Sequence, residues 1–199
     1  MSLSLLDWRR SVAELYRQVR ADAGVDPAGA LERFRIDRDR LFAGHPESPL
    51  QPADRATFAG LPYWPHNPSL RFEAILQPAE PQRLEAVGSR NEAFPLERIG
   101  RVRLPVGELD VYWIDTYGGG VFLPFRDATS GTASYGAGRY LLDTVKGADL
   151  GGDDGRLVID FNYAYHPSCA YDPRWSCPLA PRANWLTAAI EAGERLRPA

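Results

Sequence analysis

The spacing of hydrophobic side chains divides the chain into regions. Over the first 42 residues, apolar positions recur at steps of three and four, the period of an amphipathic helix. They are Leu5, Trp8, Val12, Leu15, Tyr16 and Val19, then Leu31, Phe34, Leu41 and Phe42. Gly24 separates the two sets, and Asp26-Pro27 favours a new start, because aspartate caps a helix and proline fits its first turn. Residues 1–42 are therefore predicted to form two helices.

From about residue 70 the hydrophobic period becomes two, which is typical of β-strands. The predicted strands are 70–76, 83–87, 97–104, 108–115, 121–125, 139–143 and 157–165. Residues 43–69 contain too many prolines for a continued helix, because proline lacks the backbone N–H, and we expect an ordered loop there. The stretch after residue 165 is also proline-rich and is expected to be coil.

These elements predict the α+β class. The length fits one domain over residues 1–199, and no linker divides it. We expect residues 70–199 to form a β-rich core that ends in proline-rich coil. Its sheet would be predominantly antiparallel and strongly twisted, or a partial β-barrel, with the two N-terminal helices packed on it.

The charge balance excludes some functions. The chain has 23 basic and 26 acidic residues, and Lys146 is its one lysine. Arginines alternate with acids, as in residues 37–40, so no basic face is expected and nucleic acid is not an expected partner. The sequence has no apolar run of about 18 residues and no secretory start, so we expect a cytoplasmic protein without a membrane partner. A homodimer stays open.

The cysteines and histidines give no metal or redox motif. Cys169 and Cys177 have seven residues between them, which matches neither a CxxC pair nor a zinc knuckle. We interpret them as free thiols packed like small apolar side chains, with a local disulfide as the alternative. No two histidines share a ligand spacing, so no metal and no cofactor are expected.

Two polar segments are candidates for a site. Alternation along the predicted strand 157–165 places Asp160 and Asn162 on one face, where they could orient a water or a substrate hydroxyl. The alternative is the solvent face of a half-buried strand. The second segment, residues 125–140, is a loop of glycines and hydroxyls with Arg126 and Arg139 at its ends, which suits an anion. Its alternative is a network of Arg126, Asp127 and Arg139 that fixes a long loop.

These segments resemble, in order and sequence, a prokaryotic family catalogued as domain of unknown function 1684. The motifs are Phe-Arg-Asp-Ala-Thr-Ser-Gly at 125–131, Ser-Tyr-Gly-Ala-Gly-Arg-Tyr at 134–140, Asp-Phe-Asn-Tyr-Ala-Tyr-His-Pro-Ser-Cys-Ala at 160–170, Cys-Pro-Leu-Ala-Pro at 177–181 and Glu-Ala-Gly-Glu at 191–194. The resemblance spans about residues 30–195 and implies no reaction, only that these segments belong together. The family has asparagine in place of His166, which argues against an indispensable base or metal ligand there.

The predicted function is a polar pocket for a small anionic molecule. Arg126 and Arg139 would hold the anion, and Asp160 would act as general base with Asn162 and Tyr135 as hydrogen-bond partners. The remaining ligand-binding candidates are Thr129, Ser130, Thr132 and Tyr165. We expect a metal-independent acid–base reaction such as hydrolysis. The alternatives are a non-catalytic module that binds a small metabolite, and a structural or interaction protein whose motifs only fix the fold.

Overall fold

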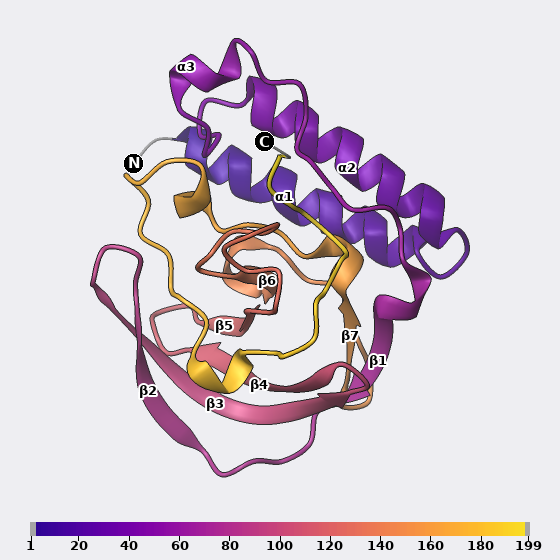
Figure 1. Cartoon of the computed structure of the whole chain (residues 1–199), viewed down its shortest axis with the longest axis vertical. Coiled ribbons are helices and arrows are strands. Elements are labelled where there is room, and N and C mark those ends of the chain that lie inside the picture. The colour runs from indigo at the N-terminus through magenta and orange to yellow at the C-terminus, as the bar shows by residue number, and fades with distance from the viewer. Residues whose placement is uncertain (1–2, 198–199) are drawn as a thin grey trace.

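Helices α1 and α2 lie side by side along one side of the β-structure (Figure 1). The computed structural model describes residues 3–197. The helices are α1 (Leu3–Asp22), α2 (Pro27–Gly44) and, in the proline-rich loop, the short α3 (Pro52–Arg55). The start of α2 is as predicted, because the Asp26 carboxylate accepts a hydrogen bond of 3.0 Å from the Gly29 N–H and Pro27 occupies the first turn. Within residues 3–197, no helix has the length and apolar character needed to cross a membrane.

The strands form antiparallel sheets. In the described residues they are β1 (Arg71–Ile75), β2 (Gln82–Val87), β3 (Ala93–Leu104), β4 (Gly107–Ile114), β5 (Gly120–Phe125), β6 (Arg139–Asp143) and β7 (Arg156–Asp160). One sheet has the order β2-β3-β4-β5-β6, and the other pairs β1 with β7. The prediction of an α+β fold with a twisted antiparallel sheet is confirmed, and within residues 3–197 the sheets do not close into a barrel.

The two sheets meet at a bend in β3. Gln77, just after β1, exchanges two backbone hydrogen bonds of 2.9 Å with Arg101 of β3. The pairing of β3 with β4 shifts register between Arg98 and Gly100, which marks a bulge, and bulges bend strands. A Cβ atom on Gly100 would lie 2.7 Å from the Leu76 side chain. Glycine at position 100 therefore lets the small sheet approach the large one.

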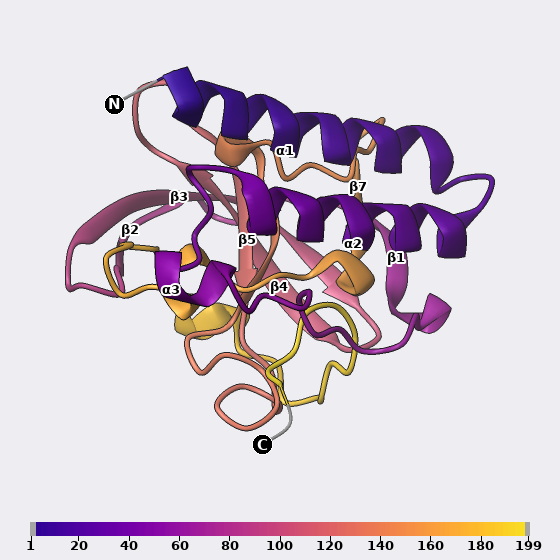
Figure 2. The same ribbon diagram turned by 90° about the horizontal axis from the view of Figure 1, so that it is seen from above.

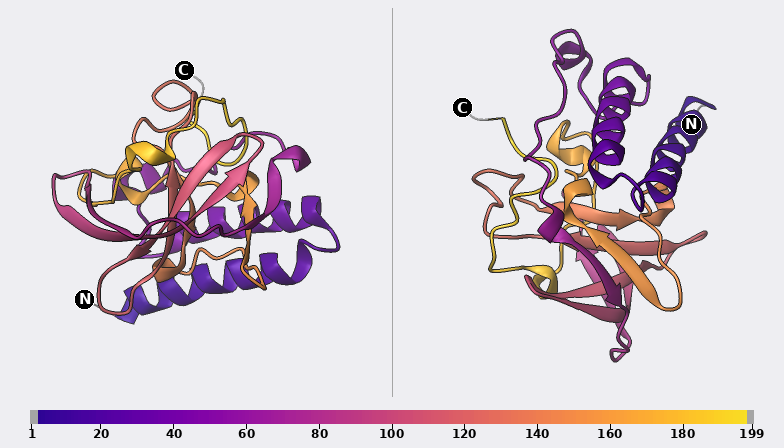
Figure 3. Two further views of the ribbon diagram at one scale, coloured as in Figure 1. Left: turned by 90° about the horizontal axis from the view of Figure 1, so that it is seen from below. Right: turned by 90° about the vertical axis from the view of Figure 1, so that its right-hand side faces the viewer.

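The helices lie against the sheets (Figures 2 and 3), and their apolar side chains join the core. Tyr16 of α1 packs edge-on against Phe34 of α2, with ring centroids 5.2 Å apart, and Phe34 packs in the same way on Tyr163 at 5.0 Å. Leu123 of β5 and Leu141 of β6 lie in the same core without any exposed surface. Burial of a side chain of this size contributes about 1.5–3 kcal/mol, so this layer stabilises the helix–sheet arrangement.

The predicted strand 157–165 is too long. Strand β7 ends at Asp160, and residues Phe161–Tyr163 form a turn of 3₁₀ helix. The physical reason is the Asp160 carboxylate, which accepts hydrogen bonds from the N–H of Asn162 at 2.9 Å and from its side-chain amide at 2.8 Å. Aspartate side chains that bond to the backbone two residues ahead replace the strand ladder by a turn. Asp160 and Asn162 are neighbours through this turn and not through strand alternation.

Candidate functional site

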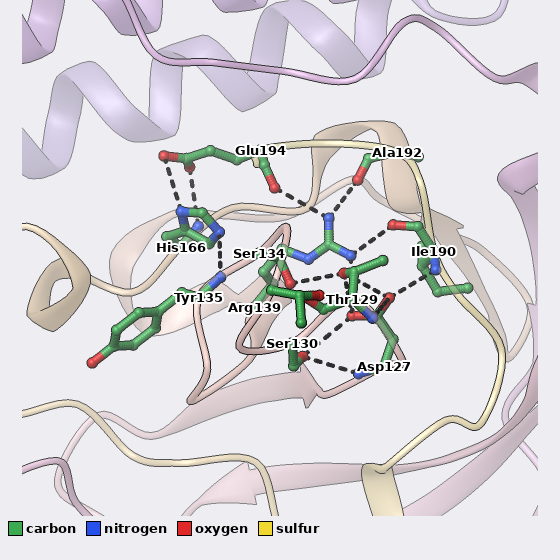
Figure 4. Close-up of polar contacts among 11 residues, drawn as sticks. Asp127, Thr129, Ser130, Ser134, Tyr135, Arg139, His166, Ile190, Ala192 and Glu194 are labelled. Atoms are coloured by element: carbon green, nitrogen blue, oxygen red, sulfur yellow. Dashed lines mark hydrogen bonds and ion pairs between the residues drawn. The ribbon is translucent and has the colours of Figure 1, made fainter. Parts of the chain in front are cut away.

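Arg139, which the sequence suggested as an anion ligand, lies inside the protein (Figure 4). Neither its side chain nor that of Asp127, its ion-pair partner at 3.3 Å, has exposed surface. The guanidinium also donates to the carbonyl oxygens of Ile190 at 2.8 Å and Ala192 at 2.5 Å. A third carbonyl, that of Glu194, accepts at 3.2 Å. Arg139 thus fixes the C-terminal coil to the start of β6.

The Asp127 side chain fixes the loop of hydroxyl residues 129–132. Its carboxylate accepts hydrogen bonds from the hydroxyls of Thr129 at 2.9 Å and Ser130 at 3.3 Å. The Ile190 N–H donates to the same carboxylate at 2.7 Å. The Thr132 hydroxyl donates to the Thr129 carbonyl at 3.0 Å. The three hydroxyls predicted to bind a ligand are therefore engaged inside the loop, and Figure 4 shows Thr129 and Ser130 in this network.

Arg126 lies elsewhere, in a groove beside strand β2. Its guanidinium carbon is 4.0 Å from the ring centroid of Trp185, and that of Arg182 is 4.2 Å from the same ring. Leu84, Val87 and Leu179 belong to the apolar lining of this groove. Within residues 3–197 neither Arg126 nor Arg182 forms an ion pair. Their charges are therefore not neutralised by an ion pair within residues 3–197, and anion binding by Arg126 stays a prediction.

Asp160 and Asn162 occupy a third place. Besides its contact with Asp160, the Asn162 side chain bonds to the backbone N–H and carbonyl of Asn67, each at 2.8 Å. Asp160 lies 4.0 Å from the Nε atom of Arg71 and lines a hollow with it. Burial raises the pKa of Asp160, and the hydrogen bonds from Asn162 oppose that shift. Arg126, Asp160 and Arg139 therefore do not meet around one ligand.

A cavity of about 70 Å³, partly open to solvent, lies between α1, α2 and β6. Most of its wall is apolar or aromatic, contributed by Trp8, Val12, Leu15, Phe34, Leu41, Phe42, Pro49, Tyr140, Ala148 and Pro167. The polar side chains of this wall are Tyr16 from α1, Arg38 from α2, Lys146, the predicted Tyr165, His166, Ser168 and Tyr171. Apolar cavities with a few convergent polar groups are the usual form of a small-molecule site.

Several polar atoms of the cavity have no protein partner. The Nε atom of Arg38 is buried and has no hydrogen-bond partner within residues 3–197. The hydroxyls of Tyr16 and Tyr165 form no hydrogen bond within the same residues. Burial raises the pKa of both phenols, so they stay protonated and can donate.

In the cavity wall, Arg38 pairs with the buried carboxyl of Glu194 at 3.0 Å. The Glu194 carboxyl also accepts hydrogen bonds from the His166 N–H at 3.0 Å and from the Tyr171 hydroxyl. Burial raises the pKa of Glu194 to about 7, against the opposing effect of Arg38. A carboxyl with a pKa near 7 changes its protonation state near neutral pH, and the net charge of the Arg38–Glu194 pair changes with it.

His166 is neutral in this arrangement. Burial, followed by the charges of Arg139 and Arg38, lowers its pKa to about 3. The Tyr135 N–H donates to Nε2 of His166 at 3.1 Å, so the hydrogen-bond network assigns the ring proton to Nδ1, which lies 3.6 Å from Glu194. Among residues 3–197, no group of three or more His, Cys, Asp or Glu side chains gathers in a way that could hold a metal ion.

Reasoning from the sequence missed Arg38, because the run 37–40 has the alternating charges of a solvated surface. A signal was present, however. Leu31, Phe34, Arg38 and Phe42 follow steps of three and four, so Arg38 lies on the buried stripe of its helix. Glu194 ends one of the resembling motifs, but no local pattern indicates that its carboxyl is buried.

A family model described as "protein of unknown function (DUF1684)" matches residues 56–195. The chain belongs to this family. The solution NMR structure of an uncharacterized protein of Haloarcula marismortui is similar to this chain, with 35% sequence identity, a TM-score of 0.58, and coverage of 86% of this chain and 95% of that chain. No curated protein matches. In this DUF1684 chain, Tyr165 and Glu194 lie inside the matched range, whereas Tyr16 and Arg38 come from the helices before it.

Proposed function

We propose that this DUF1684 chain binds a small anionic molecule with an apolar body in the cavity between α1, α2 and β6. The proposal rests on the polar atoms there that have no protein partner, namely the Nε atom of Arg38 and the hydroxyls of Tyr16 and Tyr165. Of these atoms, Arg38 Nε is fully buried, and a buried polar group without a partner costs about 1–3 kcal/mol. A ligand that accepts a hydrogen bond from Arg38 offsets that cost, and the two hydroxyls provide further donors.

The charges of the cavity favour an anion. Arg38 faces Glu194 at 3.0 Å, and Lys146 faces Asp143 at 3.5 Å. Because the pKa of Glu194 is raised to about 7, its carboxyl is protonated in part of the molecules at neutral pH, and the charge of Arg38 is then incompletely balanced. Guanidinium groups donate forked hydrogen bonds that match a carboxylate.

The size of the cavity restricts the ligand. A cavity of about 150 Å³ holds benzene, so a cavity of about 70 Å³ admits a short aliphatic chain and not an aromatic ring or a nucleotide. Lys146, whose side chain is 48% exposed, provides a charged group between the cavity and solvent. The proposed ligand class is therefore a small carboxylate with a short aliphatic body.

The test uses propionate as the probe and 1-propanol as its uncharged control, with binding measured by NMR titration of the full chain. We expect propionate to shift signals of Tyr16 and Tyr165 and to bind at least about tenfold more tightly than 1-propanol, because hydrogen bonds to charged groups contribute about 1.5–3 kcal/mol. Val12 lines the cavity, so Val12→Phe should fill it and abolish binding, whereas Val12→Ala should keep it. Unchanged binding in Val12→Phe would refute the cavity as the site.

The groove with Trp185 is the second candidate. Arg126 and Arg182, both within 4.2 Å of the Trp185 ring centroid, give it two guanidinium groups without ion-pair partners in residues 3–197. This observation favours a non-catalytic module that binds a carboxylate or phosphate. Arg126→Ala distinguishes the candidates, because it should abolish propionate binding at the groove and leave binding in the cavity unchanged. The acid–base role predicted for Asp160 and its neighbours stays a prediction.

A further inference from the structure

Cys169 and Cys177 come together in the fold. Cys169 lies in the 3₁₀ turn Ser168–Ala170, and Cys177 lies in the coil that follows. The two side chains pack in one apolar cluster with Tyr140. Both are free thiols in the described residues. The two thiols therefore share one buried cluster in their reduced form.

Separate backbone contacts fix each cysteine in place. The Cys177 N–H donates to the Ser89 hydroxyl at 3.1 Å, and the Ser89 N–H donates to the Cys177 carbonyl at 2.9 Å. Ser89 belongs to the turn between β2 and β3, so Cys177 is attached to the large sheet. The turn that carries Cys169 is closed by the Tyr171 N–H, which donates to the Ser168 carbonyl at 3.1 Å. These backbone contacts therefore hold the two cysteine segments beside their shared cluster.

The surroundings make the two thiols unequal. Cys169 keeps 9% of its surface exposed, whereas Cys177 keeps 1%. The Tyr135 hydroxyl donates to Sγ of Cys169 at 3.8 Å. The neighbouring Cys177 thiol, aided by Ser89 and Tyr135, lowers the pKa of Cys169 to about 6, and the Cys169 thiol together with burial raises the pKa of Cys177. Cys169 therefore carries the thiolate, which is the reactive form.

We propose that Cys169 and Cys177 form a dithiol site that a small hydroperoxide oxidises to a disulfide, with Cys169 as the attacking sulfur. The small exposed area of Cys169 favours an oxidant of the size of hydrogen peroxide over a bulky disulfide. This site shares Tyr140 with the wall of the cavity but needs none of the donors proposed to bind a carboxylate, so either proposal can fail without the other.

The reaction has two steps. The Cys169 thiolate attacks one oxygen of hydrogen peroxide, the O–O bond breaks, and hydroxide leaves, which gives a sulfenic acid at Cys169. The sulfur of Cys177 then attacks Sγ of Cys169, the S–S bond forms and the S–O bond breaks. The leaving hydroxide takes up the Cys177 proton as water. Overall the two thiols lose two hydrogens, and peroxide is reduced to two water molecules.

The test treats the reduced full chain with hydrogen peroxide and follows the intact mass. We expect a decrease of about 2 Da, with loss of both thiols to alkylation and full recovery by a dithiol reductant. Cys177→Ser should stop at the sulfenic acid, which dimedone traps. Cys169→Ser should leave Cys177 at least about tenfold less reactive than Cys169 is in the unchanged protein.

Circular dichroism shows whether each cysteine variant is folded. If a cysteine variant does not fold, Tyr135→Phe provides the test in its place. Loss of its hydroxyl removes the donor to Cys169, so the first oxidation step should be slower than in the unchanged protein. Two results would overturn the proposal. One is oxidation of Cys177 in Cys169→Ser at the original rate. The other is a dithiol that survives excess peroxide in the folded protein and is oxidised only in urea.

Discussion

Replacement of Arg139 by methionine tests whether this arginine supports the fold. Methionine keeps much of the side-chain volume, so the main losses are the ion pair with Asp127 and the donors to three carbonyl oxygens. Removal of one partner from a buried ion pair costs about 3–5 kcal/mol. Asp127 keeps its hydrogen bonds from Thr129 and Ile190, which prevents a larger loss. We expect unfolding to become easier by about 3–5 kcal/mol, and the Tm to fall by about 6–20 °C.

The assay is urea unfolding followed by circular dichroism, with the m-value checked for two-state behaviour. Arg126→Met is the matched control, because the Arg126 guanidinium only stacks on Trp185, a contact of about 0.5–1 kcal/mol at exposed sites. In the Arg139→Met background, Asp127→Asn should recover part of the loss, since it removes the unpaired buried charge. A stability within about 1 kcal/mol of the unchanged protein would refute the reasoning and return Arg139 to the candidate ligands.

Three further predictions follow from single contacts. The folded pKa of Glu194 is raised to about 7 from 4.5, so its contribution to stability is fully present below pH 4.5 and is lost as the pH rises through 7. The unfolding free energy of the unchanged protein minus that of Glu194→Gln should therefore fall over this pH range. A rise of this difference would contradict the burial argument. Gly138 has φ +98°, and an added Cβ would lie 2.3 Å from the Phe125 carbonyl oxygen, whereas Gly155 has φ +76° and open space around it. Gly138→Ala should therefore lower the free energy of thermal unfolding by more than about 2 kcal/mol, and Gly155→Ala by about 1 kcal/mol. Equal losses would show that the structure relieves the close contact at Gly138. Asp160→Asn should lower the unfolding free energy measured in urea by about 1–3 kcal/mol, because the 161–163 turn loses its carboxylate acceptor. If stability is unchanged but the variant no longer turns over a panel of esters or amides, the result would favour the catalytic role predicted from the sequence.

The sequence alone determined the local structure of most of the chain. Periods of three to four and of two located α1, α2 and the strands, and Asp26-Pro27 located the start of α2, because these signals depend on neighbours along the chain. The same reasoning failed at the end of β7. Alternation continues in the sequence to residue 165, but the Asp160 side chain bonds to the backbone of Asn162 and ends the strand.

The tertiary structure decided which charges are buried and which are free. Arg38, within a run of alternating charges, is buried against Glu194, although 156 positions separate them in sequence. Arg139, predicted to face a ligand, is enclosed by the C-terminal coil, whereas Arg126 lies on a groove. Local sequence determines the helix or strand on which an arginine lies. Whether its charge meets a carboxylate, a carbonyl or solvent depends on segments far away in the chain, because desolvation and pairing are set by what the fold packs around it.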